Sequence, residues 1–278
     1  MGSNLEQFVR QAKNWNLQAL EDVVCGIQEK IYGLALRMLG HQEDAKDETQ
    51  EILIKVITHL SDFREESAFS SWVYRIACNH LLTVRKKRYE RMDLTFDLME
   101  ESVSAELENM EPLTVTGPER DVFLEETRVG CMQGALVCLK REVRIAFILG
   151  EQYGVTSKEG ALILDITPEP FRKRLSRGRK SLQNFMQKNC GLVNKDNACR
   201  CHKQAGKRLK NGLIDMTFVK KKNASKGRSE ALAHLKELAV IDRTVEMYRH
   251  YPQYHTPETF TLIMKDLINS GKYKVLSE

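Results

Sequence analysis

Residues 44–89 read DAKDETQEILIKVITHLSDFREESAFSSWVYRIACNHLLTVRKKRY. Apolar residues recur in this stretch at spacings of three and four, as they do on one face of an α-helix. A helix is predicted from about Asp44 to Leu60, and a second from about Phe69 into the basic run 85–91. Strand signals are nearly absent from the whole chain, which has no β-hairpin turn flanked by alternating residues. The sequence therefore predicts an all-α protein.

The bulk composition suits a protein of two or three compact units. The chain has 278 residues, of which 42% are hydrophobic, and a formal net charge of +5, which makes an anionic partner plausible. No window approaches the roughly 18 consecutive apolar residues of a membrane-spanning helix. The first residues also lack the apolar core of a secretory signal. We expect a cytoplasmic protein without membrane insertion.

The segment between Asp97 and Glu126 differs from its surroundings. It is rich in carboxylates, contains Arg120 as its single basic residue, and carries two prolines and a glycine. Such a composition favours a flexible acidic linker, which we place at 93–126. Before it, a helical domain spans 1–92, including a helix that ends at Gly40 as a C-terminal cap.

A helix-turn-helix is predicted after the linker, within a domain at 127–188. Thr156 and Glu159 form a capping box that opens a helix over Ser157 to Leu164. The next helix begins within 167-TPEPFRKRLSRGRKSLQNF-185, where Thr167 is a possible cap and Pro168 the first residue. Its inward stripe is Phe171, Leu175, Leu182 and Phe185, and its outward donors are Arg172, Lys173, Ser176 and Arg179. This pattern is typical of a DNA-recognition helix, although a solvated basic surface is the alternative.

Two modules resemble the extracytoplasmic-function group of bacterial RNA polymerase sigma factors, of the sigma-70 family. Asp47, Gln50 and Glu51 match its D-x-x-Q-E helix, and 69-FSSWVYRIACN-79 matches its F-x-x-W-[LV]-Y-x-I-A-x-N helix. The stretch 139–182 is similar to the promoter-reading helix-turn-helix of the same group. In that group a glycine usually stands where Asp165 does here, and Pro170 replaces a small residue or threonine.

The resemblance implies a transcription-initiation factor that binds core RNA polymerase, with no catalytic residues of its own. Asp47, Gln50 and Glu51 would contact the clamp of the largest subunit, unless they are only a solvated face. Contacts to the downstream promoter element, which the protein would melt, are expected from Phe63, Ser67, Phe69, Asn79, Arg75, Arg85, Lys86 and Arg88. Contacts to the upstream element are expected from Thr167, Arg172, Lys173, Ser176, Arg177 and Arg179. Trp72 is assigned to the core, and the acidic linker either imitates nucleic acid in the polymerase cleft or is a spacer.

The cysteines are seven, an odd number that argues against a disulfide scaffold. Cys190, Cys199, Cys201 and His202 cluster in a basic segment at 189–228, and their atoms suit Zn²⁺ by ligand type. Metal binding, thiol redox sensing and a plain structural role all remain open, and no cofactor is required. A helical extension at 229–278 is either regulatory or a small docking element, and an anti-sigma partner is a further open question.

Two other functions compete with the sigma-factor reading. A stand-alone helix-turn-helix regulator would leave the Asp47 to Glu51 face and the tryptophan helix unexplained. A metalloenzyme built on the cysteine cluster is disfavoured because the sequence places no carboxylate beside it as a general base.

Overall fold

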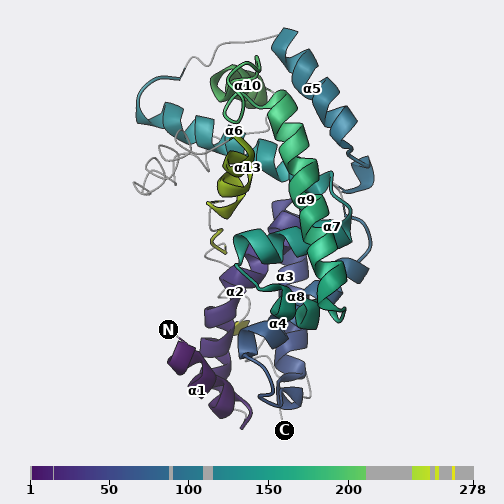
Figure 1. Cartoon of the computed structure of the whole chain (residues 1–278). Helices are drawn as coiled ribbons and strands as arrows, with labels where there is room; N and C mark the ends of the chain where they lie inside the picture. Colours follow the sequence, from purple (N-terminus) through teal and green to yellow (C-terminus); the bar gives the residue numbers. More distant parts are fainter. Residues whose placement is uncertain are drawn as a thin grey trace. The chain divides into compact units, whose positions relative to one another are not determined.

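The computed structural model describes residues 2–14, 16–87, 90–108, 115–210, 240–250, 254–256 and 265–266. Within these ranges every regular element is helical, and the one β-type pairing is an isolated bridge between Cys190 and Cys199. The predicted all-α fold is therefore confirmed. The helices, labelled in Figure 1, group into two compact units. No helix in the described ranges combines the length and the apolar character needed to cross a membrane.

The first unit comprises residues 1–91, 156–171 and 253–278. Its helices are α1 (Gly2–Ala12), α2 (Leu17–Leu39), α3 (Gln42–Thr58), α4 (Phe69–Thr83) and α8 (Ser157–Leu164), with short 3-10 turns at Leu60–Asp62 and Glu90–Met92. The side chain of Asn16 caps α2 by accepting from the Ala19 amide, and Gly40 ends α2 in the left-handed conformation, as predicted. Helix α2 is the central element because it packs against α1, α3 and α4.

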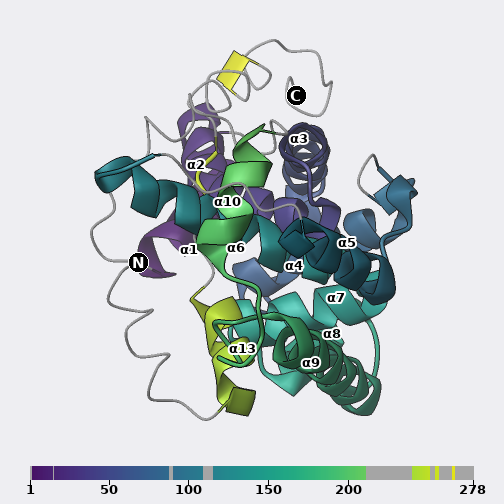
Figure 2. The ribbon, with the colours of Figure 1, turned by 90° about the horizontal axis from the view of Figure 1, so that it is seen from above.

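The second unit comprises residues 92–155 and 172–252. It contains α5 (Phe96–Glu108), α6 (Pro118–Val137), α7 (Arg141–Phe147), a π-helical turn η3 (Ile148–Gln152), α10 (Cys201–Lys210) and α13 (Val240–Arg249). Most of α9 (Pro168–Asn189) also belongs to it. Helix α10 packs on α6 and α5, and α13 packs on η3. Figure 2 shows α13 beside α9, as does Figure 1.

The predicted helix-turn-helix is present. Thr156 and Glu159 form the reciprocal capping box, and α8 has the predicted bounds Ser157–Leu164. Asp165 takes the left-handed conformation (φ 53°) in the turn, which aspartate tolerates better than most residues. Helix α9 then starts at Pro168, and Pro170 falls in its first turn, where no N–H partner is lost. The ring of Phe171 lies directly against Gly160, at which an added Cβ would be 2.2 Å from Cε2 of Phe171.

The described part of the predicted flexible linker is largely helical, which corrects that prediction. Residues 96–108 form helix α5, and α6 already starts at Pro118. Phe96 packs its ring 5.4 Å from that of Phe185, and Met99 lies against Gly134. A thin apolar stripe therefore orders this acidic segment because α6 and α9 cover it. The residues between, 109–114, lie outside the described part of the chain.

Part of the predicted C-terminal extension is also described. Val245 and Tyr248 are buried on α13. Residues 211–228 of the predicted basic segment, and the extension apart from 240–250, 254–256 and 265–266, lie outside the described residues.

Candidate nucleic-acid and polymerase interface

The basic face of α9 has the predicted form. Phe171, Leu175, Leu182 and Phe185 are all buried, so the apolar stripe faces the protein. Gly178 allows α9 to approach Phe147 closely, since an added Cβ would lie 3.1 Å from the Cβ of Phe147. The exposed residues on the opposite side include Arg172, Lys173, Ser176, Arg177 and Lys180. Long donors on one face of a well-anchored helix can reach phosphates or base edges. Thr167 is exposed at the start of the same helix.

Arg179 is placed differently from the other predicted contacts of α9. Its guanidinium binds Oε1 of Glu151, through both Nε and Nη2. The side chain of Glu151 has 0% exposure, and its other oxygen accepts from Nε of Arg249 on α13 at 3.1 Å. A buried carboxylate needs such partners, because an unpaired buried charge is very costly. Arg179, which the sequence placed among the outward donors, is therefore engaged in an ion pair with a buried carboxylate, while 43% of its side chain stays exposed.

The aromatic residues near the start of α4 form a cluster, which corrects another expectation. Phe63 is 5% exposed and Phe69 3%, so neither ring is available to stack on a base. Their ring centroids are 5.3 Å apart, and that of Trp72 is 5.5 Å from Phe63 and 5.7 Å from Phe69. Trp72, expected to be core, is instead only half-buried. Ser67, in the loop before α4, is exposed.

A pocket of about 440 Å³ opens between α3 and α4. Trp72 and Asn79 line it from α4, and Lys55 and His59 line it from the α3 side. Arg75 also lines it and forms an exposed ion pair with Asp165 at 3.2 Å. The pocket thus combines an aromatic face, an amide, several basic groups and the carboxylate of Asp62. Asn79 was predicted here, whereas Lys55 and His59 were not, because only the packing of α3 on α4 brings them to it.

The basic residues that follow α4 divide into two groups. Arg85 and Lys86 are exposed, as a phosphate-tracking role requires, and Arg88 lies outside the described residues. Lys87 instead binds Glu48 of α3, which also pairs with His80. Burial raises the pKa of Glu48, but the hydrogen bonds and charges of Lys87 and His80 outweigh it and hold that pKa below its ordinary value.

The outward face of α3 keeps its predicted acidic character. Asp47 and Glu51 are exposed, and Gln50 is half-buried between them. Glu48 of the same helix is 4% exposed and points inward. Its partners, His80 on α4 and Lys87 beyond the end of α4, explain this position, because a buried carboxylate needs hydrogen-bonding and charged partners.

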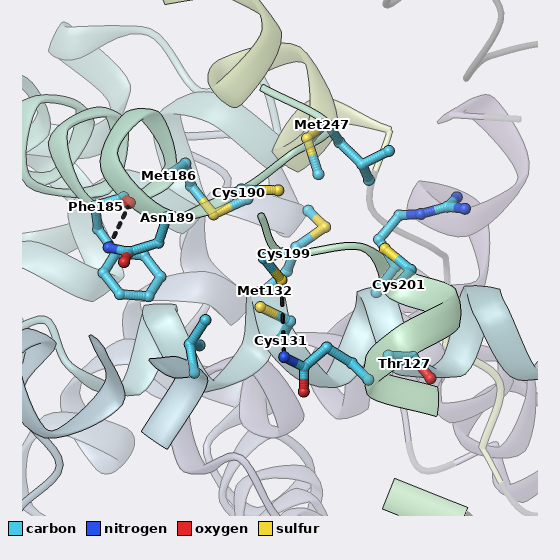
Figure 3. Close-up of a pocket in the computed structure, with 14 residues that line it drawn as sticks. Thr127, Cys131, Met132, Phe185, Met186, Asn189, Cys190, Cys199, Cys201 and Met247 are labelled. Carbon is cyan, nitrogen blue, oxygen red and sulfur yellow. Dashed lines mark hydrogen bonds between the residues drawn. The ribbon is translucent and has the colours of Figure 1, made fainter. Parts of the chain in front are cut away.

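The cysteines form an arrangement that the sequence did not predict (Figure 3). Cys190, Cys199 and Cys201 line a cavity of about 40 Å³ together with Cys131 of α6 and the thioethers of Met132, Met186 and Met247. His202 is exposed and does not line it. Burial raises the pKa of the Cys190 thiol, which favours its protonated and unreactive form.

Cys190, Cys199, Cys201 and His202, which the sequence left open as a zinc set, are not assembled as one. Among the residues that the structure describes, no three Cys, His, Asp or Glu side chains are grouped to hold a metal ion. The reason is local: His202 follows Cys201 directly in α10, so the two side chains point in different directions. The residues as they stand do not fit a tetrahedral zinc ion.

A basic helix face and a pocket with basic lining would suit a helical DNA-binding protein, and comparison with known proteins defines its class more closely. The family model described as Sigma-70 region 2 matches residues 27–91, which contain the α3–α4 pocket. The RNA polymerase sigma-H factor of Pseudomonas aeruginosa is 29% identical over 187 residues, covering 66% of this chain and 93% of that protein. The ECF RNA polymerase sigma factor SigW of Bacillus subtilis is 29% identical over 190 residues, covering 66% and 97%. The sigma factor RpoE of Bartonella quintana, in a co-crystal structure with the anti-sigma factor NepR, matches with a TM-score of 0.41 at 17% identity, covering 59% of this chain and 94% of that one.

The chain belongs to the sigma-70 family of RNA polymerase sigma factors, in the extracytoplasmic-function group. Its function is accordingly to direct the initiation of DNA-templated transcription at promoters. A stand-alone transcriptional regulator is not favoured by these relatives.

Proposed function

We propose that this sigma factor divides promoter recognition between the exposed face of α9 and the α3–α4 pocket, and holds core RNA polymerase with the acidic face of α3. The observation that carries this proposal is the pocket itself. It places an aromatic ring, an amide and basic side chains together on the segment that matches the family model.

The face of α9 reads the upstream promoter element. Arg172, Lys173, Ser176 and Arg177 are exposed on it. An arginine fork can bind guanine edges in the major groove, and lysine and serine can bind phosphates or bases. The exposed Thr167 and the first turn of α9 lie where a phosphate oxygen can approach the helix N-terminus.

The pocket captures one unpaired base of the downstream element. Its volume of about 440 Å³ falls within the range of about 300–1,000 Å³ that is usual for small-molecule sites. Trp72 offers a stacking surface and Asn79 an amide that can bind a base edge. Extruding a base costs a few kcal/mol, and stacking on an aromatic side chain returns about 1–3 kcal/mol. Arg85 and Lys86 lie beyond the end of α4, where they can follow the strand backbone.

The acidic face of α3 provides the contact with polymerase. Asp47, Gln50 and Glu51 suit a basic partner surface, which in this family is the clamp of the largest subunit. We place the protein in the cytoplasm, where transcription takes place, and assign no catalytic step to it.

Run-off transcription with purified core polymerase tests the proposal. The full chain should yield discrete promoter-dependent transcripts from genomic fragments. Arg172→Ala combined with Lys173→Ala should abolish promoter selection and leave the affinity for core polymerase unchanged. Absence of any promoter-specific transcript, or DNA recognition by the chain that does not depend on core polymerase, would overturn it and favour the stand-alone regulator.

A further inference from the structure

Glu151 occupies an unusual position in the second unit. It lies in the π-helical turn η3, immediately before the helix-turn-helix, and its side chain has 0% exposure. Its two carboxylate oxygens have different partners: Oε1 accepts from Arg179 of α9 and Oε2 from Arg249 of α13, at 3.1 Å. One buried charge therefore joins the DNA-reading helix to a helix of the C-terminal extension.

Helix α13 is docked by more than this ion pair. Tyr248 has 0% exposure, and its hydroxyl donates a buried hydrogen bond of 3.0 Å to the Met132 carbonyl of α6. Its ring meets that of Phe147 edge-on, with the centroids 5.2 Å apart. Val245 and Met247 are buried as well. Gly178 of α9 also packs closely against Phe147, so this one side chain contacts both α9 and α13.

These contacts give Arg249 a defined effect on α9. A carboxylate is planar, so a donor on Oε2 restricts the rotation of the group and fixes the direction in which Oε1 is presented. Oε1 in turn holds Arg179, which lies within a turn of Ser176 and Arg177 on the exposed face. Without Arg249, Oε2 loses its charged partner, and Arg179 can rotate to satisfy both oxygens.

We infer that α13 is a positioning element for promoter reading, and that Arg249 acts through Glu151 and Arg179 to set the orientation of α9. This inference rests on the proposed role of α9 in reading the upstream element. Arg249 and Arg179 are positioning residues, and the DNA contacts are made by the exposed side chains beside them. The C-terminal extension thus completes the DNA-reading unit and is more than an appended segment.

The test compares Arg249→Ala with Arg249→Lys in the full chain, reconstituted with core polymerase. The readout is the ratio of affinities for a promoter upstream element and for random DNA of equal length. His250→Ala is the matched control, because that exposed residue directly follows α13 and, among the described residues, pairs with Glu246 of α13 and not with Glu151. Couplings between sites are commonly about 5- to 150-fold, and we expect Arg249→Ala to lower the ratio about tenfold. Arg249→Lys should restore part of it, and His250→Ala should leave it unchanged.

The affinity ratio separates positioning from a merely structural role. A unit that partly unfolds loses specific and random DNA binding together, whereas a misplaced α9 loses the ratio of the two. A ratio that stays within about twofold of the parent in Arg249→Ala, or an equal loss of both affinities, overturns the inference. If the unaltered chain shows no preference for promoter DNA, the proposed function of α9 fails instead. The two failures are therefore distinguishable.

Discussion

Trp72 should contribute stacking energy to promoter opening, and the size of this contribution follows from its surroundings. One part of its ring packs on Phe63 and Phe69, at centroid distances of 5.5 and 5.7 Å, and another part lines the α3–α4 pocket. Base stacking on an aromatic side chain is worth about 1–3 kcal/mol per base, which corresponds to about 5- to 150-fold in affinity. Trp72→Ala should weaken binding to an opened promoter by this factor, and Trp72→Phe by less.

Abasic substitution in the DNA isolates the stacking term from any loss of stability. Holoenzyme is titrated with forked promoter DNA whose single-stranded segment carries one abasic nucleotide, moved along position by position. The parent protein should lose affinity at one position, and Trp72→Ala should be insensitive there, because the ring is already gone. Phe69→Leu, a change in the buried cluster, should lower the melting temperature and keep the abasic penalty. If Trp72→Ala retains the full penalty at every position, Trp72 does not hold the base.

Four further results are expected. Glu48→Gln should make the free energy of unfolding less sensitive to acid, because the folded protein lowers the pKa of Glu48. The carboxylate stabilises the folded state fully above its unfolded pKa of about 4.3, and this stabilisation is lost as the pH falls through the lower folded pKa. Urea titrations between about pH 6 and 3 would measure the difference. Gly160→Ala should destabilise the protein by about 1–2 kcal/mol in thermal unfolding, because overpacking costs about 1–3 kcal/mol and alanine returns at most about 1. Gly150→Ala, whose Cβ would meet only the flexible end of a leucine at 2.8 Å, should cost less. Glu51→Lys should weaken core polymerase binding about tenfold without changing the promoter preference, as measured by competition with an unaltered sigma factor. Chelator treatment of the isolated protein, with the chelator removed before core polymerase and Mg²⁺ are added, should leave run-off transcription intact, and metal analysis of the isolated protein should find well under one zinc per chain, since the described cysteines are not assembled for it.

Local patterns in the sequence were sufficient for much of the fold. The capping box at Thr156 and Glu159, the glycine cap at Gly40 and the apolar stripe of α9 are confirmed at the predicted positions. Each depends on residues within a few positions of one another, so helix geometry alone determines the outcome. Helix α5 was not predicted because the segment is rich in carboxylates and has few apolar residues, beginning with Phe96 and Met99, to indicate a buried helix face.

Relative burial could not be decided in the same way. The pattern around α4 predicted an aromatic module, but assigned Phe63 and Phe69 to DNA contact and Trp72 to the core, whereas the structure buries Phe63 and Phe69 and leaves Trp72 half-buried at the pocket. All three rings pack together, and which of them stays accessible depends on how α3 and the loop 61–67 close over α4. Glu48 turned inward for a similar reason, because its partners are on another helix.

The sequence by itself therefore determined the helices, the helix-turn-helix and the basic face of α9, since short-range periodicity and capping encode them. Only the tertiary structure decided which of these residues face outward and which pair inside. The packing of the helices placed Cys131 in the lining of the same cavity as Cys190, Cys199 and Cys201. It also placed Arg249 beside Glu151, which is far from it in the chain. Such pairings carry no local signal, because the partners meet only when the helices pack, and the requirement to neutralise a buried carboxylate then selects them.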